Sequence, residues 1–172
     1  AYESGCCLVG SEMSIRDSSW SAVEKGIALE KEWDNLCKKF AESEPDKFDL
    51  MQRLIRGEMP DNFDSDFDKF IDGLSSNSDS LATRKSSQIV LEFLQANLPE
   101  LIGGSADLSG SNNTNTKNSK DINSNDDGNY IYYGVREFGM NAVMNGMALH
   151  GGLIPYSGTF LVFMDYGRNA VR

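Results

Sequence analysis

A charged pair opens the apolar and aromatic run of residues 132–160, YYGVREFGMNAVMNGMALHGGLIPYSGTF. The pair is Arg136 and Glu137, and the neighbouring residues Val135, Phe138, Gly139 and Met140 predict that Glu137 is buried. One interpretation of Glu137 is an acid in the first turn of a helix, where the helix dipole stabilises a negative charge. The other is a buried carboxyl group that holds or shares a proton and donates it to a ring nitrogen. Arg136 is a candidate partner, although successive residues of a helix do not face each other.

A second polar cluster lies in residues 103–112, GGSADLSGSN, after a predicted strand. Glycines after a strand allow the backbone to approach a ligand closely, and Asp107, Ser109 and Ser111 supply polar groups there. The segment matches neither the G-x-G-x-x-G motif nor the P-loop. Taken alone, it is better explained as an ordinary turn.

Three aromatic residues, Phe160, Phe163 and Tyr166, follow at helical spacing. Such a stripe is typical of a packed core, and a ligand-binding cage is the alternative. From the residues alone, Arg84 near a predicted helix start is interpreted as a solvated charge. His150 is interpreted as a helix-end residue beside two glycines.

The composition excludes several classes of function. Of 172 residues, 40% are apolar, which is enough for a core. The net charge of −10 and the pI near 4.5 argue against nucleic acid as a partner, because phosphate binding needs a basic face. No apolar run has the length of a membrane span and no signal peptide opens the chain, so we expect no membrane partner. The odd number of cysteines (Cys6, Cys7 and Cys37) predicts a reduced, cytoplasmic protein, and the single histidine argues against a zinc site.

Amphipathic helices are predicted throughout the part of the chain before residue 100. Their ranges are 20–44, 46–56, 63–74 and 82–97. Pro45 ends the first helix, Gly57 caps the second, Pro99 closes the last, and residues 75–80 form a loop. The side chains expected to face inward are Val23, Ile27, Trp33, Leu36, Phe40, Phe48, Met51, Leu54, Ile55, Phe63, Phe67, Phe70, Ile71, Leu74, Ile89, Val90, Phe93 and Leu94.

The helical spacing of apolar residues ends near residue 100. Residues 100–107 are predicted to form a short strand that ends in a glycine turn, and residues 130–134 form another strand. Residues 109–129 between them contain a single aliphatic side chain, Ile122. We interpret that stretch as a long polar loop, of a kind that is usually functional or disordered.

A helix is predicted over residues 136–149, with apolar side chains on nearly every face, so we expect it to be buried. Gly151 and Gly152 end it. The segment LIPYSG then leads to another strand, and a last helix starts near Thr159 and is still running at Arg172. Strands that alternate with helices predict an α/β fold with a parallel sheet flanked by helices.

Several of these segments occur together, and in the same order, in transketolases, which the chain resembles. They are GEMPDNFD (57–64), RKSSQ (84–88), LIGGSADLSGSN (101–112), YIYYGVREFGMNAVMNGMALHGG (130–152) and PYSGTFLVFMDYGRNAVR (155–172). The resemblance implies that residues 20–48 are a helical interdomain linker. It also implies that residues 49–172 are a pyrimidine-binding domain of the thiamin diphosphate-binding fold, incomplete at its C-terminal end. Residues 1–19 have no counterpart in the family.

The resemblance implies thiamine diphosphate as the cofactor. Glu137 is then the catalytic group that hydrogen-bonds a nitrogen of the pyrimidine ring and exchanges a proton with it. Phe160, Phe163 and Tyr166 surround that ring. Asp107 is an acid close to the cofactor at a subunit interface.

The same resemblance implies sugar phosphates as substrates, with Arg84 and Ser111 binding the phosphate group. Arginine and a hydroxyl group are both good phosphate partners. The implied reaction transfers a two-carbon ketol unit from a ketose phosphate to an aldose phosphate in the pentose phosphate pathway.

The implied partner is the second subunit of a homodimer, which supplies the domain that binds the diphosphate and Mg²⁺. That domain and its metal ligands are absent from this sequence, so we expect no activity from the chain by itself. The alternatives are a related thiamine diphosphate enzyme, such as dihydroxyacetone synthase or deoxyxylulose-phosphate synthase, and a non-catalytic interaction module.

Overall fold

The computed structural model describes residues 23–76, 80–123 and 127–172. These residues fall into two units, and the boundary between the units lies between Asp49 and Leu50. The two gaps fall in segments that we expected to be loops. None of the described helices is both long and apolar enough to span a membrane.

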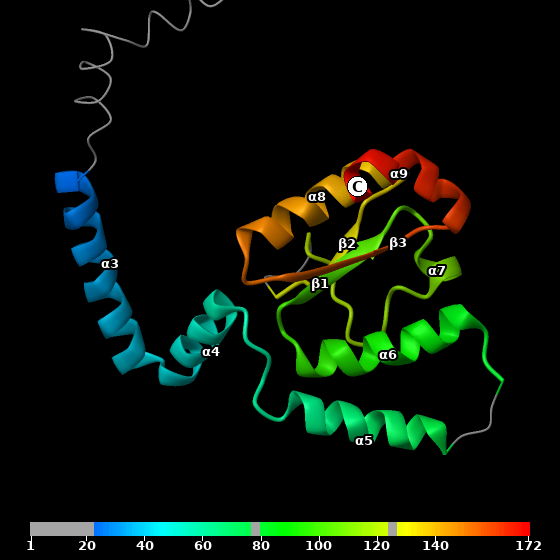
Figure 1. The fold of residues 1–172 in the computed structure, drawn as a ribbon, viewed down its shortest axis with the longest axis horizontal. Coiled ribbons are helices and arrows are strands. Elements are labelled where there is room, and N and C mark those ends of the chain that lie inside the picture. The colour runs from blue at the N-terminus through cyan, green and yellow to red at the C-terminus, as the bar shows by residue number, and fades with distance from the viewer. Residues whose placement is uncertain (1–22, 77–79, 124–126) are drawn as a thin grey trace, which may run out of the picture. The chain divides into compact units, whose positions relative to one another are not determined.

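The first unit contains helix α3, Val23–Ser43, and the beginning of helix α4, Pro45–Arg56 (Figure 1). Proline suits the first position of a helix, because the missing N–H would have no partner there. Pro45 therefore begins α4 directly after α3 has ended. Phe40 and Phe48 pack edge to face across the junction, with ring centroids 6.2 Å apart.

Within the described residues of its own unit, the apolar stripe of α3 is not covered. The expectation that it faces inward is wrong for these residues, because the two helices described there provide no second layer. Its exposed members are Val23, Ile27, Trp33 and Leu36, each more than half exposed, and Ile55 of α4 is exposed as well. The predicted helix start at Trp20 and residues 1–19, with Cys6 and Cys7, lie outside the described residues.

The helical layer of the second unit is held by phenylalanine side chains. Helix α5, Phe63–Ser75, and helix α6, Thr83–Asn97, confirm the two predicted helices. The rings of Phe63, Phe67 and Phe70 surround Phe93, with centroid distances to it of 6.2, 5.7 and 4.5 Å. The inward-facing stripe of α5 was therefore predicted correctly at these positions.

Three parallel strands form the sheet and confirm the predicted α/β class. They are β1, Leu101–Ser105, β2, Tyr130–Tyr132, and β3, Ile154–Gly158, in the order β2-β1-β3. Helices α8, Glu137–His150, and α9, Met164–Val171, lie on one side of the sheet. Helix α6 lies on the other side, with α5 outside it (Figure 1).

The two glycines of β1 lie inside the strand and do not form the predicted turn. Gly103 pairs with Tyr130 and Tyr156 in the flanking strands. A Cβ atom at Gly103 would overlap Tyr156, and one at Gly104 would overlap the backbone of Ile131. Glycine is therefore needed in the middle strand for close packing of its neighbours.

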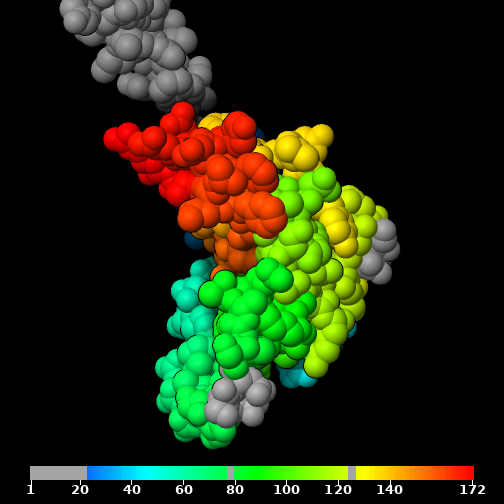
Figure 2. Space-filling view, turned by 90° about the vertical axis from the view of Figure 1, so that its right-hand side faces the viewer, coloured from blue at the N-terminus to red at the C-terminus, as the bar shows by residue number. Residues whose placement is uncertain are grey.

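The described residues of the polar segment between β1 and β2 contain regular structure that the predicted loop lacks. The segment contains the four-residue helix α7, Ser109–Asn112, and a bridge between Asp121 and Tyr130. Asp107 and Asn113 flank α7 with φ angles of 61° and 53°, a left-handed conformation that Asp and Asn tolerate better than other residues. Figure 2 shows this segment, in yellow-green, against the green atoms of α6.

Helix α8 was predicted to be buried on every side, and this expectation is wrong in the described structure. Its buried residues are Glu137, Met140 and Asn141, whereas Phe138 is 53% exposed and Leu149 is 88% exposed. Phe138 and Leu149 therefore lie on faces of α8 that no described element covers. Gly151 ends the helix with a φ of 82°, as predicted.

The last helix also begins later than predicted. A 3₁₀ turn, Leu161–Phe163, comes first, and α9 starts only at Met164. Phe160 keeps an extended conformation (φ −72°, ψ 146°). The side chain of Thr159 is hydrogen-bonded to Glu137 instead of capping a helix.

An ion pair attaches α4 to the N-terminal edge of the sheet. Nη1 and Nη2 of Arg53 donate to the two carboxylate oxygens of Glu100 over 2.7 and 3.0 Å. The side chains of Arg53 and Glu100 are 16% and 4% exposed. Glu100 also accepts a hydrogen bond from the backbone of Ile154 through its own carbonyl oxygen, so the pair lies where β1 and β3 begin.

Replacing Arg53 by Leu should lower the free energy of unfolding by about 2–4 kcal/mol, because it leaves the Glu100 carboxylate buried without its partner. The free energy is measured by urea denaturation. The double variant Arg53→Leu with Glu100→Leu should recover most of the loss, since no unpaired charge remains. Equal stability of the wild type and the single variant would contradict a stabilising role for this contact.

Candidate functional site

The parallel sheet gathers the predicted site residues at one edge. Asp107 and Ser111 follow the end of β1, Glu137 follows β2, and Phe160 and Phe163 follow β3. Ligands of open parallel sheets bind outside the carboxyl ends of the strands. The residues predicted from distant parts of the sequence therefore share the edge where a ligand is expected.

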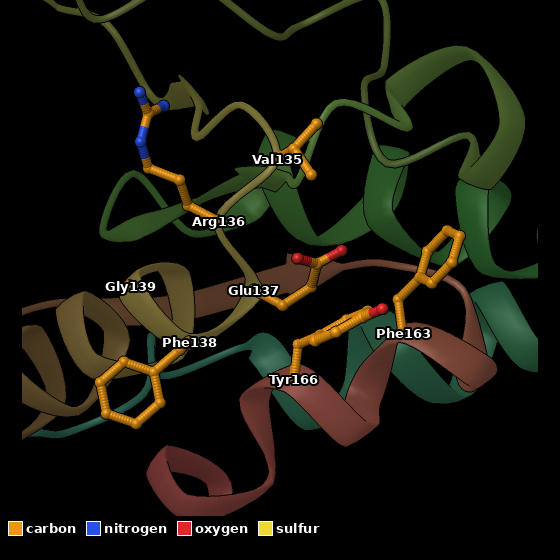
Figure 3. A pocket seen from close by; sticks show the side chains of 7 residues that line it. All are labelled: Val135, Arg136, Glu137, Phe138, Gly139, Phe163 and Tyr166. Carbon is orange, nitrogen blue, oxygen red and sulfur yellow. The ribbon is translucent and has the colours of Figure 1, made fainter.

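The turn between β2 and α8 sets the position of Glu137. Gly134 has a φ of 66°, and a side chain there would meet Nη1 of Arg136 at 2.6 Å. That nitrogen donates to the carbonyl oxygen of Tyr133 over 2.8 Å. The guanidinium of Arg136 therefore closes the turn, and Figure 3 shows it pointing away from the carboxylate of Glu137.

Glu137 is a buried acid, and few side-chain contacts stabilise its carboxylate. It is 6% exposed, and its Oε1 accepts a hydrogen bond of 3.3 Å from Thr159. Among the described residues, no ion pair involves Glu137 and no hydrogen bond reaches its Oε2. Glu137 is the first residue of α8, so the helix dipole helps to stabilise a charge there. An ordinary helix-start acid is largely exposed to water, whereas the side chain of Glu137 is mostly buried.

The carboxylate faces an open hollow of about 690 Å³ with largely apolar walls. Figure 3 shows Glu137 directed towards the space between Val135, Phe163 and Tyr166, with Phe138 on the other side of the helix start. The volume is within the range of small-molecule sites, roughly 300–1,000 Å³. Apolar walls beside a single carboxyl group suit a small, largely apolar ligand that carries a polar atom able to share a proton with Oε2.

The predicted aromatic residues come together in a row of ring contacts. Phe160 and Phe163 are stacked with centroids 5.7 Å apart, and Phe163 and Tyr166 are 6.4 Å apart. Phe163 and Tyr166 line the hollow, whereas Phe160 does not. Tyr166 is 70% exposed, so the row is not the core stripe that its spacing also allowed.

The polar candidates lie outside the hollow. Asp107, Ser111 and Arg84 are exposed, and none of their side chains has a hydrogen-bond or ion-pair partner among the described residues. Arg84 is in the first turn of α6, and Gln88 one turn later donates to the carbonyl oxygen of Asn115 over 2.8 Å. The face of α6 that carries Arg84 therefore adjoins the loop that follows α7.

A buried network that sequence reasoning missed holds this loop. The hydroxyl of Tyr130, which is 1% exposed, is 2.7 Å from Oγ1 of Thr114 and donates to Oγ of Ser109 over 2.7 Å. The hydroxyl of Tyr156 donates to the carbonyl oxygen of Thr114 over 3.0 Å and accepts from Gln95 over 3.1 Å. Burial raises the pKa of Tyr156, so it remains a neutral donor.

Metal ligands are not found in this part of the protein. The described residues contain no group of three or more His, Cys, Asp or Glu side chains that could hold a metal ion. Cys37, the described cysteine, is a free thiol. The fold and the hollow together define an α/β domain with a candidate small-molecule site at the carboxyl edge of its sheet.

Comparison with known proteins identifies the family. Residues 79–172, more than half of the chain, match the model of the family described as "Transketolase, pyrimidine binding domain". The chain therefore belongs to the transketolase family.

The relatives are much longer than this chain. The plasmid transketolase of Cupriavidus necator is 50% identical over 154 residues, and transketolase 1 of Escherichia coli is 47% identical over 155 residues. Each alignment covers 90% of this chain and 23% of the relative. The chain thus spans about a quarter of the length of the curated relatives it matches.

Solved structures of transketolases share the fold. The enzyme of Leishmania mexicana superposes with a TM-score of 0.76 at 38% identity, over 87% of this chain and 22% of that protein. A transketolase of Pichia stipitis in complex with sedoheptulose-7-phosphate superposes with a TM-score of 0.79 at 34% identity, over 95% of this chain and 24% of that protein.

Replacing Tyr130 by Phe should loosen residues 108–114 while the strand remains intact. The change removes two hydrogen bonds worth roughly 0.5–1.5 kcal/mol each, which together correspond to about 5- to 150-fold faster amide exchange in this segment. Hydrogen–deuterium exchange with peptide resolution measures it. Tyr132→Phe on the same strand is the matched control, because Tyr132 is 58% exposed. Equal exchange in the two variants would show that the network does not hold α7.

Proposed function

We propose that this chain supplies the pyrimidine-binding half of the thiamine diphosphate site of a transketolase. The parent enzyme transfers a two-carbon ketol unit from a ketose phosphate to an aldose phosphate. The observation that carries the proposal is the buried Glu137 carboxylate, with one oxygen unbonded, at the wall of an aromatic hollow. Membership of the transketolase family supports it.

In this proposal Glu137 holds and returns a proton at a nitrogen of the pyrimidine ring. Thr159 fixes one oxygen of the carboxylate, so that the other is available to the ring. Phe163 and Tyr166 pack against the faces of the ring and keep water away from the proton, and Phe160 supports Phe163 from behind. Thiamine diphosphate, when bound, supplies the nucleophilic carbon and the electron sink for cleavage of the carbon–carbon bond.

The remaining cofactor contacts are proposed to come from the rest of a homodimer. Mg²⁺ needs a group of ligands that the described residues do not bring together. The exposed apolar side chains of Phe138, Leu149, Leu161 and Val162 support contact of this part of the chain with the rest of the assembly. Asp107 is proposed to lie near the cofactor at that interface.

Sugar phosphates are the proposed substrates. Arg84 and Ser111 present donor groups that no described residue uses, and each lies near the carboxyl edge of the sheet. Their assignment to the substrate phosphate is supported by the sugar phosphate in the complex of the Pichia stipitis relative.

The proposals on the pathway, the cellular location and the domain boundaries rest on the family alone. We propose that the reaction belongs to the pentose phosphate pathway and takes place in the cytoplasm. We also propose that residues 20–48 link two domains and that the pyrimidine-binding domain begins near residue 49.

In the full-length protein, Arg84→Ala should raise the KM for phosphorylated acceptors about ten- to a hundredfold, because a charged hydrogen bond is worth roughly 1.5–3 kcal/mol. The KM for unphosphorylated acceptors should stay nearly the same. Steady-state kinetics with paired substrates measures the difference, and Lys117→Ala, which removes an exposed charge from the same loop region, is the control. An equal rise for both kinds of acceptor would remove the phosphate role.

Glu137→Ala and Glu137→Gln should both slow exchange of the cofactor C2 proton for deuterium by roughly 10²–10⁴, the usual contribution of general acid–base catalysis. The amide of the Gln variant can donate a hydrogen bond but cannot exchange a proton. Both variants are made in the full-length protein. Their affinity for the cofactor should fall only modestly, because most of the proposed binding contacts are made by residues other than Glu137. The measurement is NMR of the bound cofactor after transfer to deuterated buffer.

The matched control for Glu137 is Asp165→Asn, which removes an exposed acid from the first turn of α9. It should exchange at the wild-type rate. Wild-type exchange in both Glu137 variants would show that Glu137 is only a helix-start charge.

A further inference from the structure

Helices α8 and α9 touch at a glycine. Gly167 is buried, and a Cβ atom there would overlap Nδ2 of Asn141 and lie 3.3 Å from the carbonyl oxygen of Glu137. A side chain as small as a methyl group therefore does not fit between the helices at this point. The contact lies next to Tyr166 on α9 and one turn from Glu137 on α8.

Asn141 cannot easily make room for a larger neighbour. It is 7% exposed, and its Nδ2 donates to the carbonyl oxygen of Glu137 over 2.8 Å. A rotation of its side chain would break this bond and leave a buried amide unpaired, which is costly. One turn further, Nδ2 of Asn145 donates to the carbonyl oxygen of Ala170 over 2.7 Å, so the two helices are tied again.

We propose that Asn141 and Gly167 are a size-matched pair of positioning residues that sets the spacing between α8 and α9. The spacing determines the distance between the Glu137 carboxylate and the aromatic wall formed by Phe163 and Tyr166. The functional consequence rests on the proposed function, because the hollow matters only if it receives the cofactor ring. Neither residue touches the ring, so each acts through the helices that carry Glu137 and Tyr166.

The test is a double-variant cycle in the full-length protein with Gly167→Ala, Asn141→Ala and the two combined. Gly167→Ala should lower the melting temperature of the cofactor-free protein and weaken thiamine diphosphate binding about tenfold, as expected for an overpacked contact. Asn141→Ala alone should weaken binding less than about threefold, since it removes bulk and one hydrogen bond. The combined variant should recover both the melting temperature and the dissociation constant relative to Gly167→Ala, because the new methyl group occupies the space of the lost amide.

Two further measurements make the cycle decisive. Gly73→Ala on α5 is the matched control, because a Cβ atom there has no neighbour within 4 Å, and it should leave cofactor binding unchanged. Crystal structures of the cofactor-free wild type and the Gly167→Ala variant should show α9 displaced from α8 in the variant. This structural readout does not depend on the cofactor.

The outcomes separate this inference from the proposed function. If the wild type does not bind thiamine diphosphate, the proposed function fails, and the crystal structures still decide whether the pair sets the spacing. An unmoved α9, or a combined variant no better than Gly167→Ala, would overturn the inference. Rescue of the melting temperature with equal cofactor affinity in every variant would overturn it as well, since the pair would then be a packing contact without a positioning role.

Discussion

Parallel pairing of β1 with both β2 and β3 is the constraint on which the rest of the structure depends. It brings the carboxyl ends of three strands to one edge, and these ends carry the segments that contain Asp107, Glu137 and Phe163. The pairing requires residues without side chains in the middle strand, and these are Gly103 and Gly104. Side chains at these two positions would separate the strands and disperse the site.

The burial of Glu137 at this edge is unfavourable for folding, and it leaves a carboxylate oxygen available to a ligand. Withdrawal of a carboxylate from water is unfavourable unless other groups compensate for it. The start of α8 and the single bond from Thr159 compensate in part and leave one oxygen without a partner. In the proposed complex, a nitrogen of the pyrimidine ring is the hydrogen-bond partner of that oxygen. Because the chain spans about a quarter of its relatives, the diphosphate and metal contacts are proposed to lie in the rest of the enzyme.

The sequence predicts those features that depend on local pattern. The stripe of Phe63, Phe67 and Phe70 and the stop at Gly151 follow from spacing and backbone preference, and the structure confirms them. The exposure of part of α8 could not be predicted. An apolar pattern indicates that a helix face is buried, but it does not show which element buries it or whether that element lies within this chain. Thr159, Asn141, Gly167 and the Tyr130 network depend on contacts between distant segments, which no spacing rule reports. Glu137 was singled out by its apolar setting, but the family resemblance was needed to choose between its two interpretations.

The most direct test of the proposed role of Glu137 is a crystal structure of the full-length protein with thiamine diphosphate and magnesium. We expect the pyrimidine ring to lie against Phe163 and Tyr166. We also expect the Glu137 oxygen not bonded to Thr159 to lie about 2.6–3.2 Å from a ring nitrogen, within hydrogen-bond distance. A ring bound elsewhere, or a Glu137 carboxylate turned away from it, would show that Glu137 does not have this role.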